Sequence, residues 1–216
     1  MTTNIDLYYT MRSPYCYLAT PLITELVSKY DLMVDLKPVY PLAVSDPTFF
    51  TKVNPLWPPY LQRDTQRIGD RLGIPFRWPR PDPIVQDRQT RKVAAEQPHI
   101  TRLTHFAQIA AEKKRGLEYV ANVSGLLYSP EIDGWNEGDH LANAMTRAGL
   151  DLQEFEDLAA QDADRLEACV HANRENQLAA GHWGAPLFVF EGELFFGQDR
   201  IDDLVWHLQN NGLRER

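Results

Sequence analysis

Four consecutive residues near the N-terminus, Ser13-Pro14-Tyr15-Cys16, have the spacing of a site for thiol chemistry. A cysteine at position 13 would complete a Cys-x-x-Cys pair, the pattern of a dithiol redox centre. Ser13 replaces that thiol with a hydroxyl, which donates a hydrogen bond but forms no disulfide. Serine is also a preferred helix N-cap residue, so a purely structural capping role for Ser13 stays open. The pattern raises the question of what such a site does without its leading thiol.

The elements that position this stretch form a strand-helix-strand unit. Residues 5–10 alternate in polarity and are rich in aromatic side chains, which predicts a strand. Pro14 fits the first turn of a helix, and the apolar spacing carries that helix to about Tyr30. Residues 32–40 predict a second strand. The candidate site therefore lies at the junction of the first strand and the first helix.

The middle of the chain is predicted to be mostly helical. A proline-rich loop over 41–59 leads into a helix at 59–72, which Gly73 ends. Residues 76–90 contain several prolines and little periodicity, which indicates an irregular lid or connector. From about 100 to 177 nearly every segment has helical spacing. Breaks are predicted at Gly116, Ser129-Pro130, Gly134, Gly138 and Gly149.

The pattern changes again near the C-terminus. The stretch PLFVFEGELFFG at 186–197 predicts two short strands joined at Glu191-Gly192 as a hairpin. From Asp199 to about Asn210 the apolar residues lie on one helical face, which predicts an amphipathic helix. The predicted order of elements along the chain is therefore βαβ, a long helical block, and then ββα.

Charge and composition argue against several classes of function. The chain has 216 residues and a net charge of -8, with a pI of about 5.2, so no nucleic-acid partner is expected. Its two cysteines do not make a secreted disulfide framework, and its six histidines have no metal-ligand spacing. The sequence contains neither a signal peptide nor an apolar run of the ~18 residues that would cross a bilayer. We therefore expect a cytoplasmic protein with no metal and no membrane partner.

Three stretches together resemble one known family. They are SPYCYLA at 13–19, YLQRDTQRIGDRLGIPF at 60–76 and GHWGAPLFVFEGELFFGQDRIDDL at 181–204. These are similar to the 2-hydroxychromene-2-carboxylate isomerases and the related kappa-class glutathione transferases, in the DsbA-like branch of the thioredoxin superfamily. The resemblance implies an α/β fold with a thioredoxin-like (DsbA-like) domain of residues 1–40 and 181–216. An all-helical insertion at 55–180, with an irregular loop at 76–90, would split that domain.

The resemblance also implies that glutathione is the cofactor. A free alkyl thiol has a pKa of about 8.5 and is mostly protonated near neutral pH. The N-terminus of a helix stabilises an anion, and the hydroxyl of Ser13 can donate a hydrogen bond to the sulfur. We therefore interpret Ser13 as the catalytic residue. It would hold an external thiolate, which a cysteine at this position would consume by forming a disulfide.

The other glutathione contacts follow from the same resemblance. It implies a cis peptide bond before Pro186, which would turn the backbone of Ala185 toward the cysteinyl unit. Gln198 and Asp199 would bind the γ-glutamyl end, with Asp199 taking the ammonium group. Asn54 would lie near the sulfur and the aromatic substrate. A trans strand-edge proline at 186, a helix N-cap at 199 and a plain turn residue at 54 are the structural alternatives.

Two positions depart from the family pattern. Trp57 stands where these isomerases tend to carry a lysine, so one cation that could bind a substrate carboxylate is absent. We interpret Trp57, with Asn54, as a substrate-binding residue. Cys16 stands where serine is usual, and it is predicted to point into the core. Cys169 is likewise expected to pack in the core.

The reaction predicted from the resemblance is a glutathione-dependent isomerisation of a small aromatic substrate by a homodimeric enzyme. The thiolate would add to a conjugated double bond, which rotates and re-forms as the thiolate leaves. Aromatic residues of the loops are expected to form a flat apolar pocket, namely Phe49, Phe50, Trp57, Tyr60, Trp78 and Trp183. The alternatives are a kappa-type glutathione transferase and a DsbA-like thiol-disulfide oxidoreductase that acts through Cys16.

Overall fold

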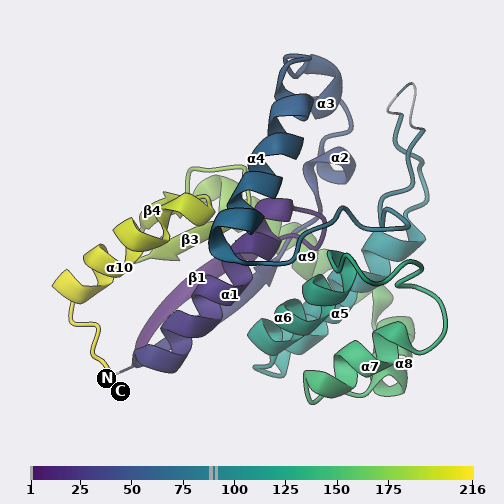
Figure 1. Ribbon diagram of the computed structural model, residues 1–216. Coiled ribbons are helices and arrows are strands. Elements are labelled where there is room, and N and C mark those ends of the chain that lie inside the picture. The colour runs from purple at the N-terminus through teal and green to yellow at the C-terminus, as the bar shows by residue number, and fades with distance from the viewer. Residues whose placement is uncertain (1, 88–89, 91) are drawn as a thin grey trace.

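The computed structural model describes residues 2–87, 90 and 92–216, and it contains a four-stranded sheet (Figure 1). The strands are β1 (Thr3–Tyr9), β2 (Leu32–Pro38), β3 (Leu187–Phe190) and β4 (Glu193–Phe196). Their order across the sheet is β2-β1-β3-β4, with β1 and β2 parallel and β3 antiparallel to both of its neighbours. The two ends of the chain therefore meet in one sheet, as the sequence predicts.

The parallel half of the sheet is the predicted strand-helix-strand unit. Helix α1 (Pro14–Lys29) follows β1 and returns the chain to β2, because parallel neighbours need a crossover of this kind. Ser13 is its N-cap, with extended backbone dihedrals and a side chain that accepts a hydrogen bond. The predicted strands, helix and cap are confirmed. The second strand ends at Pro38 rather than at residue 40, because its partner Tyr9 is the last residue of β1.

The antiparallel half is the predicted hairpin. Glu191 and Gly192 join β3 to β4 with φ values of 49° and 86°. Positive φ at both central residues is the geometry that matches the twist of a two-residue hairpin. A short 3-10 turn, η1 (Gln198–Arg200), then leads into α10 (Ile201–Asn210), which confirms the predicted C-terminal helix.

The chain between β2 and β3 is largely helical, also as predicted. Its longer helices are α4 (Trp57–Leu72), α5 (Pro98–Glu112), α6 (Gly116–Leu127), α7 (His140–Arg147), α8 (Leu152–Gln161) and α9 (Ala163–Ala179). Gly73 ends α4 with a left-handed backbone, as expected. Gly116 differs from the prediction because it begins α6 instead of lying in a break. A Cβ at Gly116 would lie 2.8 Å from the Cβ of Leu36, so glycine lets α6 approach β2 closely.

The segment predicted as a loop over 41–59 is more ordered than its composition suggests. Two single-turn helices, α2 (Leu42–Ser45) and α3 (Phe49–Lys52), occupy it. Helix α4 begins at Trp57 rather than at 59. Pro58 and Pro59 fit its first turn because N–H groups there have no intrahelical acceptor.

The sheet and the helical block share one hydrophobic core. Helices α5, α6 and α9 contact β2, whereas α10 contacts α1 and β4. One cluster of buried side chains includes Leu7 and Phe188 of the sheet, Leu18 of α1, Phe106 of α5 and Tyr119 of α6. The domain boundaries at 1–40, 55–180 and 181–216 stay a prediction. Within the described ranges, none of the helices is both long and apolar enough to cross a membrane.

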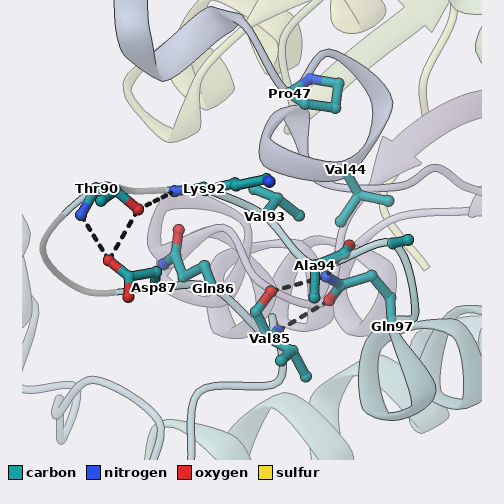
Figure 2. A pocket seen from close by; sticks show the side chains of 11 residues that line it. Val44, Pro47, Val85, Gln86, Asp87, Thr90, Lys92, Val93, Ala94 and Gln97 are labelled. Atoms are coloured by element: carbon teal, nitrogen blue, oxygen red, sulfur yellow. Dashed lines mark hydrogen bonds between the residues drawn. The ribbon is translucent and has the colours of Figure 1, made fainter.

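An irregular connector links α4 to α5. Its base is held by Gln97, whose side-chain amide accepts from the N–H of Val85 at 2.9 Å and donates to its carbonyl at 2.8 Å (Figure 2). Near its tip, Asp87 accepts from the N–H of Thr90 at 2.6 Å. This connector borders a shallow groove of about 720 Å³ beside α2. The prediction of an irregular segment at 76–90 is confirmed for its described residues, and positions 88 and 89 lie outside them.

Candidate functional site

A cavity of about 1080 Å³ opens where β1 ends and α1 begins. Its walls come from the start of α1, the loops around α2 and α3, the first turns of α4, the connector after α4 and the loop before β3. Of the predicted site residues, Ser13, Asn54, Trp57 and Ala185 line it. The structure therefore brings residues from both ends and from the middle of the chain to one cavity.

Ser13 joins the start of α1 to the loop before β3. Its hydroxyl donates to the carbonyl oxygen of Ala185 at 3.3 Å and accepts from the N–H of Cys16 at 3.3 Å. Both distances are long for hydrogen bonds of these types. The N–H of Tyr15 has no acceptor in the part of the chain that is described. A weakly bonded hydroxyl and a free N–H at a helix start are the donors that an anion needs.

The loop before β3 presents backbone groups to the cavity. The peptide bond between Ala185 and Pro186 is cis, as predicted. Gln177 of α9 donates to the carbonyl of Gly184 at 2.7 Å, and the N–H of Gly197 donates to the carbonyl of Pro186 at 3.0 Å. Among the described residues, nothing accepts from the N–H of Ala185. A main-chain donor is thus available beside Ser13 for a peptide-like ligand.

Gln198 and Asp199 do not line the cavity. They lie in η1, directly after Gly197, whose N–H is hydrogen-bonded to the cis-proline loop. Gln198 is buried, whereas Asp199 is exposed. Asp199 forms an ion pair with Arg200 at 2.8 Å, and its side chain does not cap a helix. Exposed ion pairs of this kind are weak. A ligand ammonium group can therefore compete with Arg200 for the Asp199 carboxylate.

Cys16 is fully buried behind Ser13. Burial raises the pKa of its thiol to about 12 from the ordinary value of 9.0. Because the thiolate is the nucleophilic form, this thiol is unreactive near neutral pH. The prediction that Cys16 points into the core is confirmed. Cys169, expected to pack in the core, is only half-buried.

Asn54 lines the cavity, and it also acts as a turn residue, which is the structural alternative given for this position. Its side-chain oxygen accepts from the N–H of Leu56 at 3.0 Å, and its main-chain oxygen accepts from the N–H of Trp57 at 2.9 Å. This side-chain turn is typical of asparagine before a helix. Trp57 is half-buried and lines the same wall.

The predicted aromatic pocket is confirmed in part. Phe49, Trp57, Trp78 and Trp183 line the cavity, and the rings of Phe49 and Trp183 lie 5.3 Å apart. Tyr60 is not part of the lining and is exposed. The side chain of residue 50 lies outside what the structure describes.

No sequence pattern predicts the ion pair that fixes one wall of the cavity. Arg12 donates two hydrogen bonds to Asp82, from Nε at 2.7 Å and from Nη2 at 2.6 Å. The guanidinium of Arg12 also lies over the ring of Trp78, at 4.7 Å from its centroid. All three residues line the cavity. The connector after α4 is therefore bound to the start of α1, although no sequence pattern links positions 12 and 82.

Arg174 of α9 is a second cation on the cavity wall that no sequence pattern predicts. Its Nη1 donates to the carbonyl of Trp183 at 2.7 Å and to the side-chain oxygen of Gln177 at 2.8 Å. The residue lies in the middle of an ordinary helical pattern, so nothing in the sequence distinguishes it from a surface arginine. Across the described ranges, no group of histidine, cysteine and acidic side chains could hold a metal ion.

Comparison with known proteins identifies the fold of this chain. The profile of the DSBA-like thioredoxin domain matches residues 4–209. No curated protein matches the chain significantly. The predicted α/β, DsbA-like fold is confirmed.

Solved structures with this fold belong to both isomerases and redox proteins. A 2-hydroxychromene-2-carboxylate isomerase superposes with a TM-score of 0.71 and 20% identity, over 96% of this chain and 95% of that chain. The cytosolic disulfide reductase DsbM from Pseudomonas aeruginosa has a TM-score of 0.60 and 19% identity, over 96% and 98% of the two chains. A probable DsbA oxidoreductase from Streptomyces coelicolor has a TM-score of 0.63 and 15% identity, over 96% and 88%. At such identities the similarity concerns the fold, so function depends on the site itself.

Proposed function

The chain belongs to the DSBA-like thioredoxin domain family, and from that premise we propose that it is a glutathione-dependent isomerase of the 2-hydroxychromene-2-carboxylate type. Its substrate would be a small aromatic 2-oxo acid or the cyclic form of one. Bound glutathione would supply the reactive sulfur. The enzyme would act in the cytoplasm as a homodimer.

The observation that carries this proposal is the identity of the two residues at the thiol position. Where a redox member of the fold needs an accessible thiol, this chain has the hydroxyl of Ser13, at 3.3 Å from the carbonyl of Ala185. The remaining thiol, Cys16, is fully buried, and burial raises its pKa to about 12. A site with a hydroxyl donor, free backbone N–H groups and no accessible thiol suits an external thiolate better than a disulfide.

The proposed reaction balances without an oxidant or a metal. The glutathione sulfur forms a bond to a carbon of the conjugated double bond, and the electron pair of that double bond moves onto the ketone oxygen. The former double bond is then single and rotates. When the carbon–sulfur bond breaks, the double bond re-forms in the other geometry and the thiolate is regenerated.

Different residues of the site would have different roles in this reaction. Ser13 and the N–H of Tyr15 would hold the sulfur as an anion at the start of α1. The backbone of Ala185 would pair with the cysteinyl unit, while Gln198 and Asp199 would bind the γ-glutamyl end. The aromatic walls, with Asn54 and Trp57, would orient the substrate beside the sulfur.

A kappa-type glutathione transferase is the second candidate, because it would use the same bound thiolate against a different electrophile. The two activities are separated by substrate. Turnover of an o-hydroxybenzylidenepyruvate would support the isomerase, whereas conjugation of a chloronitrobenzene alone would support the transferase. A thiol-disulfide oxidoreductase acting through Cys16 is disfavoured by the burial of that thiol.

The deciding experiment measures isomerisation of an o-hydroxybenzylidenepyruvate with glutathione, without it, and with S-methylglutathione. The methylated tripeptide keeps the peptide contacts but has no thiol. We expect turnover only with glutathione. Turnover that is independent of glutathione, or equal with S-methylglutathione, would contradict the proposal.

A further inference from the structure

Arg174 differs in its hydrogen-bond partners from Arg12, another arginine of the cavity wall. Its Nη1 donates to two neutral oxygens, the carbonyl of Trp183 at 2.7 Å and the side chain of Gln177 at 2.8 Å. Arg12, by contrast, is paired in a bidentate fashion with a carboxylate. Arg174 is half-buried and lines the cavity, yet no carboxylate in the described part of the chain forms an ion pair with it.

A half-buried guanidinium without a counter-charge is energetically unfavourable. Burial lowers the pKa of Arg174, and Asp46 offsets this only in part, from beyond ion-pair distance. Charged groups that leave water are normally paired with an opposite charge. The planar guanidinium fork has five N–H donors, and a carboxylate is the group that matches its geometry best. The site therefore favours an anionic ligand.

The position of Arg174 relates it to the proposed thiolate site. Its hydrogen-bond acceptor Trp183 precedes Ala185 by two residues, so their Cα atoms are at most about 7 Å apart. Ala185 in turn accepts the hydrogen bond of Ser13. The guanidinium and the serine hydroxyl are therefore both anchored on the same short loop. The rings of Phe49 and Trp183 line the same cavity as the guanidinium and provide an aromatic surface in it.

We propose that Arg174 is the carboxylate-binding residue of this cavity, recognising the acid group of an aromatic ligand or that of glutathione. That the carboxylate belongs to an aromatic substrate or to glutathione rests on the proposed function. That Arg174 binds a carboxylate at all rests on the geometry of the cavity. Arg174 would fix the ligand at one end while the reacting carbon lies near the sulfur at Ser13. The residue would thereby select acids over neutral compounds of the same shape.

Because Arg174 also supports the loop at Trp183, the test needs a measurement that loop support alone does not change. That measurement is the ratio of affinities for trans-cinnamate and trans-cinnamamide, determined by calorimetry. The two compounds have the same shape and differ in charge. A distorted loop lowers both affinities, whereas loss of the cation lowers only the affinity for the acid.

We expect the wild-type protein to bind cinnamate about 10- to 100-fold more tightly than the amide, the range of one charge-assisted hydrogen-bond pair. Arg174→Met should abolish the difference, and Arg174→Lys should retain part of it. Arg165→Met serves as the control, because it removes an exposed cation from the same helix. This variant should keep the preference for the acid.

A second comparison identifies the source of the carboxylate. If Arg174 binds the glycyl end of glutathione, Arg174→Met should abolish the preference for glutathione over its glycyl ethyl ester and leave the cinnamate ratio unchanged. The proposal for Arg174 would be contradicted if Arg174→Met kept both the preference for cinnamate over its amide and the preference for glutathione over its ester. It would also be contradicted if the wild type showed neither preference. Absence of glutathione binding by the wild type would refute the proposed function, while the cinnamate comparison would still test Arg174.

Discussion

The Ser13→Ala variant tests the proposed role of the hydroxyl in quantitative terms. A hydrogen bond to a charged group contributes about 1.5–3 kcal/mol, and one pKa unit corresponds to about 1.36 kcal/mol. The hydroxyl should therefore lower the pKa of the bound glutathione thiol by roughly one to two units, from about 8.5 to about 6.5–7.5. Near pH 7 the variant should contain about 8- to 25-fold less thiolate.

The sign of the pH dependence follows from the state that is stabilised. Because Ser13 stabilises the deprotonated sulfur, its loss raises the thiol pKa and moves the pH–activity curve of the variant upward. Wild type and variant should converge above about pH 9, where both thiols are ionised. The assay is titration of the bound thiolate by its ultraviolet absorbance, together with kcat/KM as a function of pH.

The substitution also removes the bond from the N–H of Cys16 that caps α1. Such a cap contributes about 0.5–2 kcal/mol to stability. Asp151→Ala is a matched control, because Asp151 caps α8 at 2.8 Å from the N–H of Glu154 and is not part of the cavity lining. It should lower the melting temperature to a similar extent and leave the thiol pKa unchanged. Equal thiol pKa values in wild type and Ser13→Ala would refute the reasoning.

Three further predictions concern the walls of the site. Cys16→Ala should keep glutathione-dependent turnover, and in the native wild type this thiol should resist iodoacetamide, as followed by mass spectrometry; loss of turnover would favour the redox alternative. Asp82→Asn should leave the guanidinium of Arg12 unpaired, lower stability by about 1–3 kcal/mol in denaturant unfolding, and increase proteolysis of the connector; unchanged values would mean that the pair does not hold this segment. Gly184→Ala should weaken glutathione binding in calorimetry, because its Cβ would lie 2.3 Å from an aromatic ring, whereas Gly125→Ala has no heavy atom within 4 Å of the new Cβ and should bind normally.

The parts of the fold that could be predicted from the sequence depend on neighbours within a few residues. The cap at Ser13, the end of α4 at Gly73 and the hairpin turn at Glu191-Gly192 each depend on local backbone preference. Burial of Cys16 followed from its position one helical turn inside α1. Each of these features follows largely from backbone preference or helical position within a few residues, so a local pattern is sufficient to find it.

The parts that could not be predicted depend on residues far apart in the chain. The Arg12–Asp82 pair joins positions separated by 70 residues. Arg174 faces the cavity only because α9 packs beside the loop before β3, and its sequence neighbours do not show this. The start of α4 at Trp57 differs from the predicted start at 59 for a local reason, because two prolines indicate a loop unless the first turn of a helix accommodates them.

The most direct measurement is the crystal structure of the protein with bound glutathione. We expect the sulfur within hydrogen-bond distance of the Ser13 hydroxyl, the cysteinyl backbone paired with Ala185, and the γ-glutamyl end at Gln198 and Asp199. A sulfur joined to Cys16 as a mixed disulfide, or a tripeptide bound away from the start of α1, would contradict the central claim.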